Sequence, residues 1–342
     1  MGIGAAVQMM NKKQILSASK IKTFESCSWK FWCNYFLALP QESNDGARRG
    51  TVCHLIFELL LKDRHQKHFY LLMEGGSLSA SESIARLVRT ALKREGGYSE
   101  ENYLLCEEMI LVGLDNDFYG SKGKVTDPEK EFLLESENPT YKVRGFMDKP
   151  IKYNKKVKIV DYKSSKSKFN NKELKSNVQA MTYSLASLSL WPKLKNVIIE
   201  FLFLRFPKSP SQQIRFTKEQ LSGFEYYLEH VYKIINNFTE SDAKSNFASS
   251  QPMPKRDEGF CGPLNCGFAK HKGQLKKDGT LMWHCPYKFD FEYYSLVDSN
   301  GDIIKNSFKE DDLDASKGEV KLKQYDGCPA HTRSNDDFDF MD

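Results

Sequence analysis

The stretch VDYKSSK, residues 160–166, places an acidic and a basic side chain two positions apart at the end of a run that otherwise reads as a β-strand. Side chains along a strand alternate between its two faces, so Asp161 and Lys163 project side by side. The earlier positions of the same face, Val157 and Ile159, are apolar. The charged pair therefore lies at the end of an apolar strand face, beside the side chains of the neighbouring strand.

The preceding strand-like run, TYKVRGFMDKPIKY, joins this strand through a short polar turn around Asn154 and Lys155. A loop of either two or four residues pairs positions whose numbers sum to 309, which sets Asp148 directly opposite Asp161. Opposed residues have Cβ atoms roughly 4.5–5.5 Å apart, and like charges there repel. A metal ion would resolve the conflict, because carboxylate oxygens suit Mg²⁺ or Mn²⁺. The alternative is a surface hairpin whose lysines screen the acids.

Two predicted helices carry further polar pairs at helical spacing. GTVCHLIFELL sets His54 and Glu58 four positions apart on one face, and VQAMTYSLASL does the same with Gln179 and Tyr183. Either pair alone is more typical of a satisfied surface or core contact than of a functional site. The two helical pairs together with Asp148, Asp161 and Lys163 indicate a catalytic or metal-binding site.

Periodicity along the chain predicts an α/β domain with a mixed sheet. Helical spacing of apolar residues is readable at 19–37, 47–63, 79–95, 100–119, 172–190 and 217–237. Strand-like runs fall at 130–136, 141–152, 157–163 and 196–206. Helices, a hairpin, a helix, a strand and more helix follow one another, which favours a central sheet flanked by helices.

We expect a single domain over residues 1–309 and an acidic tail over 310–342. The domain would comprise N-terminal helices (17–63), a helical insertion (64–125), a catalytic core (126–237) and a cysteine-containing segment (240–290). The tail ends SNDDFDFMD, and its composition predicts disorder. Aromatic residues among aspartates also fit a peptide that docks on a protein partner, or one that lies in a basic cleft as a DNA mimic.

The formal charge of +5 combines about +11 over residues 1–309 with −6 in the tail. The positive excess favours a polyanionic partner, although a solvated basic face would read the same way. Lysines crowd around the quoted stretch at positions 149, 152, 155, 156, 158, 163, 166, 168, 172 and 175. Neither a membrane span nor a signal peptide is readable, so we expect a cytoplasmic protein.

Taken in order, the motifs resemble the RecB-type branch of the PD-(D/E)XK nuclease superfamily. The matching elements are Gly50…His54…Glu58, Gly145-x-x-Asp148, Asp161-Tyr162-Lys163 and Gln179-x-x-x-Tyr183. The stretch SASKIKTFESCSWKFWCNYF is similar to the N-terminal signature of that branch, and the resemblance spans about residues 17–290. It implies a restriction-endonuclease-like core, in which helices flank a central mixed β-sheet, with a helical insertion and a C-terminal cysteine-containing segment.

The resemblance implies metal-dependent hydrolysis of DNA phosphodiester bonds. Asp148, Asp161 and the main-chain carbonyl of Tyr162 would bind Mg²⁺ or Mn²⁺, and His54 would add the imidazole ligand typical of this branch. Glu58 would bind the ion through water or support one of its ligands.

Other residues would act on the substrate. Lys163 would position or activate the attacking water and stabilise charge developing on the phosphate. Gln179 and Tyr183 would steady Lys163 or grip the DNA backbone. Contacts to DNA would come from the lysines that follow the motif: Lys166, Lys168, Lys172 and Lys175.

The function that follows is an exonuclease acting on single-stranded or end-bearing DNA in recombination, replication or repair, as in AddB-like and CRISPR-associated exonucleases. One alternative is a nucleic-acid-binding protein on a catalytically silent nuclease scaffold, which the intact Asp148, Asp161 and Lys163 disfavour. Another is a metalloenzyme that acts on small molecules or proteins, which the basic surroundings disfavour. No P-loop motif is present, so any unwinding of DNA would need a partner.

Eight cysteines in a chain read as cytoplasmic do not indicate a disulfide framework. Resemblance to the iron–sulfur members of the branch implies a [4Fe-4S] cluster held by Cys27, Cys261, Cys266 and Cys285. Eighteen residues separate Cys266 from Cys285, a looser arrangement than the compact triplet of those relatives. Zn²⁺ is the alternative, with His271 or His284 completing a site with the last three cysteines.

Overall fold

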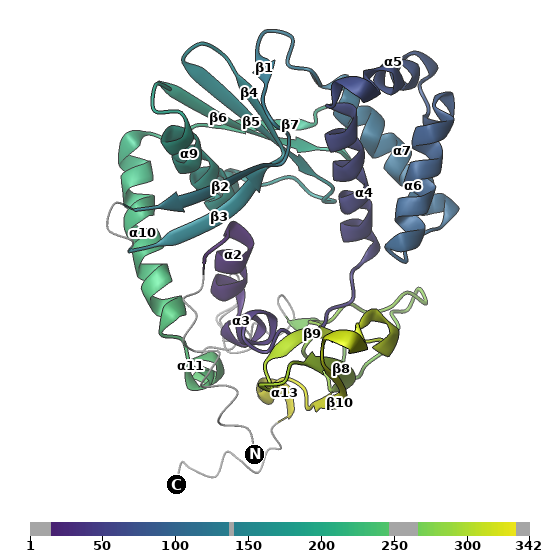
Figure 1. Cartoon of the computed structure of the whole chain (residues 1–342), viewed down its shortest axis with the longest axis vertical. Coiled ribbons are helices and arrows are strands. Elements are labelled where there is room, and N and C mark those ends of the chain that lie inside the picture. The colour runs from purple at the N-terminus through teal and green to yellow at the C-terminus, as the bar shows by residue number, and fades with distance from the viewer. Residues whose placement is uncertain (1–14, 137–139, 246–265, 333–342) are drawn as a thin grey trace. The chain divides into compact units, whose positions relative to one another are not determined.

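The computed structural model describes residues 15–136, 140–245 and 266–332, which fall into two compact units (Figure 1). We call Ile15–Ala18 with Ser43–His230 the sheet unit, and Ser19–Glu42 with the described residues from Val231 onward the flanking unit. This division differs from the single domain predicted over 1–309, because the flanking unit combines segments from both ends of the chain. Within the described residues, no helix is long and apolar enough to cross a membrane.

The sheet unit is built on a mixed five-stranded sheet, as predicted. Its strands, in spatial order, are β1 (Lys124–Val125), β4 (Lys149–Lys152), β5 (Lys156–Lys163), β6 (Asn196–Phe203) and β7 (Ser211–Ile214). β5 and β6 run parallel, and the other neighbours in this sheet run antiparallel. Seven of the eight residues of β6 are buried, which explains why NVIIEFLF is apolar on both faces, apart from Asn196 and the buried Glu200, rather than alternating.

The run predicted as one strand over 141–152 is divided at Asp148. Before it, β3 (Lys142–Met147) pairs with β2 (Lys130–Glu135) in a separate two-stranded sheet; after it, β4 joins the central sheet. β4 pairs with β5 in the predicted register, from Lys149 opposite Val160 to Lys152 opposite Val157. Asp148 is thus the junction between two sheets.

The helices of the sheet unit agree with the predicted segments, with one addition and one division. They are α4 (Asp45–Leu60), α5 (Gln66–Gly75), α6 (Glu82–Arg94), α7 (Glu100–Asp115), α8 (Asn171–Lys175), α9 (Val178–Leu190) and α10 (Lys218–Asn236), the last continuing into the flanking unit, with 3₁₀ turns at Asp63–His65 and Leu78–Ala80. The helix α5 lies in the predicted insertion. The segment 172–190 is divided because Asn177 leaves the helical conformation and caps α9, its side chain accepting a hydrogen bond from Ala180 N.

A single core joins the helices α4, α6 and α7 to one face of the sheet. The ring of Phe57, on α4, stacks on that of Tyr162, on β5, with centroids 4.2 Å apart. Gly113 of α7 permits this contact, since a Cβ there would lie 2.3 Å from Cζ of Phe57. The face of β5 that carries Tyr162 is therefore filled, and the functional side chains occupy the other face.

The flanking unit contains helices and a three-stranded antiparallel sheet. Its helices are α2 (Ala18–Ser26, whose first residue belongs to the sheet unit), α3 (Ser28–Tyr35), α11 (Glu240–Ser245) and α13 (Pro329–Thr332). Its strands, in spatial order, are β10 (Glu319–Tyr325), β8 (Phe291–Val297) and β9 (Ile303–Ser307), with 3₁₀ turns at Glu310–Asp312 and Ala315–Lys317.

The prediction of disorder over 310–342 is wrong for the described part of that segment. β10 pairs with β8 along its whole length, from Glu319 opposite Val297 to Tyr325 opposite Phe291. The buried Tyr325 anchors the strand, because its hydroxyl donates to the carbonyl of Tyr287 at 3.0 Å and accepts from Nε1 of Trp29 at 2.8 Å. The strand was not predicted because the segment contains many acidic residues. The terminal SNDDFDFMD lies outside the described residues.

Candidate functional site

Asp161 and Lys163 lie on the face of β5 opposite Tyr162, as the alternation predicted. Asp161 is only 1% exposed. Its Oδ2 atom lies 2.6 Å from Nζ of Lys163, but the contact lacks hydrogen-bond geometry, and this oxygen has no hydrogen-bond partner among the described residues. The ammonium of Lys163 offsets part of this buried charge, and the missing hydrogen bond leaves Oδ2 able to bind a further cation.

The helix α9 supplies the polar groups that hold this pair. The amide of Gln179 contacts both charges: its Oε1 accepts from Nζ of Lys163 at 2.8 Å, and its Nε2 donates to Oδ1 of Asp161 at 2.9 Å. The hydroxyl of Tyr183 lies 3.2 Å from the same Oδ1 and 2.7 Å from the carbonyl oxygen of Phe146. Burial raises the pKa of Tyr183 well above its usual value, so the phenol stays protonated and can donate.

Asp148 faces an acidic residue on each side. The register of β4 and β5 continues past Lys149 to place it beside Asp161, and its Oδ2 accepts a hydrogen bond from Tyr162 N at 2.9 Å. The register of β2 and β3 continues in the same way to Glu129, whose backbone N–H donates to the carbonyl of Asp148 at 3.1 Å. Glu129, Asp148 and Asp161 therefore form a row of three carboxylates across two hairpins.

The helix α4 brings His54 to this row. Its Nδ1 lies 3.5 Å from Oδ2 of Asp148 and 3.6 Å from Oε1 of Glu129, and its Nε2 lies 3.3 Å from the carbonyl oxygen of Tyr162. His54, Glu129 and Asp148 each offer a ligand atom within 4.8 Å of the other two. The structure thus brings together three of the predicted metal ligands, His54, Asp148 and the Tyr162 carbonyl, with Asp161 beside this close group rather than within it.

The electrostatics of the site favour binding of a cation. Burial lowers the pKa of His54, but the carboxylates of Asp148 and Glu129 outweigh that effect and raise it to about 9. Burial, together with the charge of Asp161, raises the pKa of Asp148 to about 7. The rise for His54, and part of the rise for Asp148, reflect excess negative charge, which a divalent ion would relieve more effectively than a proton.

The residues present fit such an ion. Two carboxylates, an imidazole and a backbone carbonyl converge, and Oδ2 of Asp161, which is ion-paired with Lys163 but accepts no hydrogen bond, adds a fifth donor nearby. Oxygen donors suit Mg²⁺ and Mn²⁺, and the imidazole moves the preference towards Mn²⁺.

Glu129 is the residue that sequence reasoning missed. It precedes β2 in the left-handed region, with φ of 51°, which is uncommon for a residue with a side chain. The signal was present: pairing of Phe132 with Gly145 implies a register that sets Glu129 opposite Asp148. Glu58, by contrast, does not join the site, because its carboxylate pairs with Lys62 at 2.8 Å one turn further along α4.

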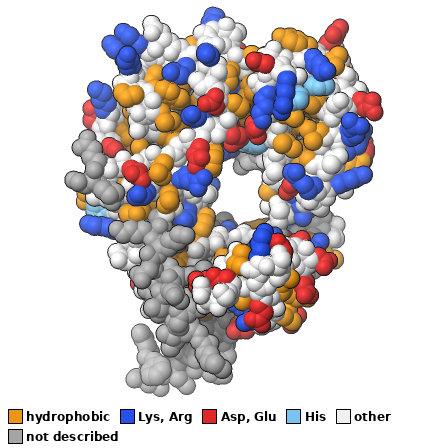
Figure 2. All heavy atoms as spheres, in the orientation of Figure 1, with side chains coloured by type: hydrophobic (Ala, Val, Ile, Leu, Met, Phe, Trp, Pro, Cys, Tyr) orange, Lys and Arg blue, Asp and Glu red, His pale blue; other side chains and the backbone are white. Residues whose placement is uncertain are grey.

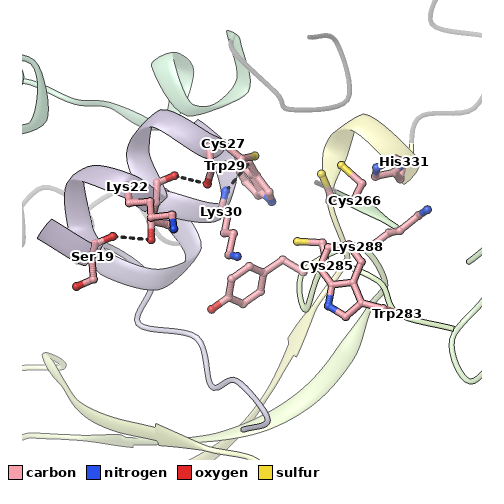
Figure 3. A pocket seen from close by; sticks show the side chains of 14 residues that line it. Ser19, Lys22, Cys27, Trp29, Lys30, Cys266, Trp283, Cys285, Lys288 and His331 are labelled. Carbon is pink, nitrogen blue, oxygen red and sulfur yellow. Dashed lines mark hydrogen bonds between the residues drawn. The ribbon is translucent and has the colours of Figure 1, made fainter. Parts of the chain in front are cut away.

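The flanking unit holds a second set of ligand atoms. A cavity of about 440 Å³ is lined by the cysteines Cys27, Cys266, Cys285 and Cys328, together with Trp29, Trp283, three lysines and His331 (Figure 3). The seven described cysteines form no disulfide. Burial raises the pKa of the Cys285 thiol, and raises that of Cys328 to about 12, with the nearby thiols adding to the effect on Cys328. Four thiols around one cavity are a soft donor set, the kind that holds zinc or an iron–sulfur cluster.

Three of the four predicted cysteine ligands lie at this cavity. Cys261 is outside the described residues, and Cys328, which was not among the predicted ligands, also lines the cavity. The histidines proposed as zinc ligands do not line the cavity, and Nδ1 of His284 lies 3.0 Å from the carbonyl oxygen of Cys285. His331, on the short helix after β10, lines it instead.

Only some lysines of the predicted basic cluster are exposed on the surface. Lys149 is fully buried, and its ammonium donates to the carbonyl of Phe118 at 3.2 Å, so it cannot contact DNA. Lys166, Lys172 and Lys175 are exposed, whereas Lys168 is half-buried, with its ammonium bonded to Ser209. Figure 2 shows lysine and arginine side chains spread over the visible face rather than gathered in one patch.

The chain was compared with protein families, curated proteins and solved structures. A search of curated proteins found no match. Among solved structures, the chain is similar to a Eubacterium rectale protein provisionally described as an exonuclease, at 14% identity and a TM-score of 0.44, covering 81% of this chain and 95% of the other. The profile of the PD-(D/E)XK nuclease superfamily matches residues 15–269. This range includes every residue of the acidic site, by which we mean Glu129, Asp148 and Asp161 with the neighbouring His54, Lys163, Gln179 and Tyr183. The chain therefore belongs to the PD-(D/E)XK nuclease superfamily.

Proposed function

We propose that this protein is a metal-dependent deoxyribonuclease that hydrolyses phosphodiester bonds. The observation that carries the proposal is the row Glu129, Asp148 and Asp161, with His54 beside it from α4 and Lys163 two positions beyond Asp161. Three carboxylates face one ammonium and one imidazole among the described neighbours. A divalent ion would complete the charge balance of such a site, and members of this superfamily typically use one.

Each residue has a role that its contacts support. His54, Glu129, Asp148 and the carbonyl of Tyr162 would hold the ion, and Asp161 would complete its ligands through Oδ2. When bound, Mg²⁺ or Mn²⁺ would act as a Lewis acid towards a non-bridging phosphate oxygen and lower the pKa of a bound water. Gln179 holds the ammonium of Lys163 at the site, where it would orient the attacking water and balance charge developing on the phosphate.

Within this function we propose an exonuclease acting on single-stranded or end-bearing DNA in recombination, replication or repair. The resemblance of the motifs to the RecB-type branch supports this choice. The alternative, a silent nuclease scaffold that only binds nucleic acid, is disfavoured because Gln179 and Tyr183 both contact Asp161, and Gln179 also holds Lys163.

The test uses end-labelled single-stranded, duplex and closed circular DNA with Mg²⁺, with Mn²⁺ and with EDTA. Linear strands should shorten with either metal, at least as fast with Mn²⁺, while closed circles survive. Cutting of closed circles would show an endonuclease, cleavage of RNA alone would reassign the substrate, and equal cleavage in EDTA would refute the metal site. Binding of DNA without hydrolysis would favour the silent scaffold.

We also propose that the cavity of the flanking unit holds an inorganic cofactor, with Cys27, Cys266, Cys285 and Cys328 as its ligands. Among the described residues, no three of these sulfurs lie within 4.8 Å of one another. A single zinc ion with Zn–S bonds of about 2.3 Å needs closer sulfurs. A [4Fe-4S] cluster bonds each thiolate to a different iron and so accepts wider spacing, which makes it the better candidate and Zn²⁺ the alternative.

The ligand set can be tested by metal content. Anaerobically purified protein should be brown, with iron and labile sulfide in near-stoichiometric amounts, and Cys328→Ala should remove both. Cys261→Ala should leave them unchanged, as should the control Cys106→Ala in the core of the sheet unit. Colourless protein carrying one zinc would favour the zinc site, and loss of iron in Cys261→Ala but not in Cys328→Ala would restore the ligand set predicted from the sequence.

A further inference from the structure

Between Cys266 and Cys285 the chain forms a hairpin, which we call the lysine hairpin (residues 266–285). The backbone N–H of Cys285 donates to the carbonyl of Cys266 at 3.0 Å and closes its base, while Leu275 and Leu281 are opposed near its tip. The turn follows Lys276, whose N–H and carbonyl both bond across it, and Gly279 at φ of 77° supplies the left-handed residue that such a three-residue loop requires.

The base of this hairpin is tightly built. A Cβ on Gly267 would lie 2.2 Å from the carbonyl oxygen of Trp283 and 2.6 Å from Cα of His284, so only glycine allows the two strands to approach. The ammonium of Lys288 donates to the carbonyl of Gly267 at 2.9 Å. These contacts hold the next residue, Phe268, close to Trp283 at the root of the hairpin.

Large apolar side chains project from the lysine hairpin into solvent. Phe268 is 70% exposed, Leu275 56%, Leu281 68% and Trp283 56%. Because Leu275 and Leu281 are directly opposed, their side chains share one face. The hairpin also carries four exposed lysines and one aspartate: Lys270, Lys272, Lys276, Lys277 and Asp278. Exposed aromatic and aliphatic groups on a segment of net charge +3 fit a partner that is both anionic and able to stack on aromatic rings.

We propose that the lysine hairpin binds single-stranded nucleic acid, with Phe268 and Trp283 stacking on bases and the lysines neutralising phosphates. Unpaired bases offer π-faces to aromatic side chains, and this contact combined with a basic groove is how proteins hold single strands without sequence preference. A duplex keeps its bases stacked inside and could use only the lysines. The choice of a nucleic acid rather than an acidic protein rests on the proposed nuclease function; the binding itself does not require hydrolysis.

Binding of a fluorescent oligothymidylate to the full-length protein tests this proposal. An Asp161→Ala background prevents cleavage, and fluorescence anisotropy gives the affinity. Phe268→Ala and Trp283→Ala should each weaken binding about tenfold, the size expected for a lost stacking contact, and Trp283→Phe should restore most of it. Lys276→Gln with Lys277→Gln should reduce the log–log salt slope by about 1.4. Tyr226→Ala, an equally exposed aromatic in the sheet unit, should have no effect.

The outcomes separate the two proposals. Unchanged affinity in the Phe268 and Trp283 variants, or equal losses for single-stranded and duplex oligonucleotides, would overturn stacking by the hairpin while leaving the nuclease intact. Hydrolysis that never occurs, with binding that depends on these two side chains, would refute the nuclease and support the hairpin. Trp283 also lines the thiol cavity, so its variant must keep the metal content of the parent protein; Phe268→Ala, which lies outside that lining, provides the independent case.

Discussion

The acidic site of the sheet unit and the thiol cavity of the flanking unit are assembled in different ways. In the acidic site, backbone register aligns the three carboxylates: β2 with β3 places Glu129 opposite Asp148, and β4 with β5 places Asp148 opposite Asp161. In the thiol cavity, Cys27 comes from the N-terminal part of the chain and Cys328 from the segment that follows β10. Register can be read from alternation and loop length, whereas the packing of distant segments cannot.

The two sites also differ in their chemistry. Carboxylate and carbonyl oxygens are hard ligands that bind Mg²⁺ or Mn²⁺ reversibly, and buried thiolates are soft ligands that retain zinc or iron. If both proposals hold, the two sites should respond separately to chelators and to substitutions. The predictions below test that separation, from the largest expected effect to the smallest.

Chelation should distinguish the sites most strongly. Brief EDTA treatment should abolish DNA cleavage, and Mn²⁺ or Mg²⁺ should restore it, because the oxygen ligands exchange their ion with solvent. Iron or zinc measured on the same sample should remain bound. Loss of both metals together, or cleavage that persists in EDTA, would contradict the separation.

Asp161→Asn should reduce the cleavage rate at least about a hundredfold, since it removes a carboxylate that would help to hold the metal ion. DNA affinity should be unchanged or tighter, because the site becomes less negative, and the metal content of the thiol cavity should not change. Asp127→Asn, whose side chain is largely exposed, is the matched control and should behave like the parent protein. Near-normal turnover in Asp161→Asn would remove this residue from the site.

Glu129→Gln tests the residue that was found only in the structure. Mn²⁺ affinity, measured by isothermal titration, should fall about 10–100-fold, the usual cost of losing a group that binds or supports a metal. The pKa of His54 should fall as well, since Glu129 helps to raise it. Glu131→Gln, which breaks only the exposed pair with Arg144, is the control. Unchanged Mn²⁺ affinity would show that Glu129 does not take part in metal binding.

Lys149→Met should alter the pH dependence of stability and little else. Burial lowers the pKa of Lys149 to about 7 in the folded protein, whereas the unfolded value is about 10.4. Between these values the unfolded chain binds more protons, so this residue makes the free energy of unfolding rise with pH, by up to about 1.4 kcal/mol per unit. Urea unfolding from pH 7 to 10 should show the rise in the parent protein and a flatter profile in Lys149→Met. Parallel profiles would show that the ammonium is not desolvated as its burial indicates.

The sequence predicts the core of the sheet unit well because its information is local. Alternation in VKIVDYK and the short turn before it suffice to set the β4–β5 register, and the spacing of Gln179 and Tyr183 places both on one face of a helix. Glu129 escaped because it lies before β2 in a left-handed conformation, where strand patterns no longer apply. Glu58 was included through its helical spacing from His54 and through the family resemblance, although the same spacing of four residues also pairs Glu58 with Lys62.

The flanking unit was less predictable for a different reason. The strand β10 follows a run of acidic residues. The prediction of disorder relied on the average composition of 310–342 and overlooked the short alternating segment EVKLKQY, which forms the strand. Because β10 was not foreseen, nothing in the sequence placed Cys328, which follows this strand, near the other cysteines. Long-range pairing of β8 with β10 places the segment that carries Cys328, and no pattern within either strand encodes that pairing.

If the acidic site binds a metal ion, the position of Asp148 between two hairpins makes that binding depend on correct strand pairing. A slip of one residue in either ladder would turn a carboxylate towards the opposite face and leave the ion with too few ligands. Metal would then stabilise only chains in which both registers are correct, by mass action on that population. The same ion that would cut DNA would therefore also select, among folding molecules, those whose two sheets have been joined in the right alignment.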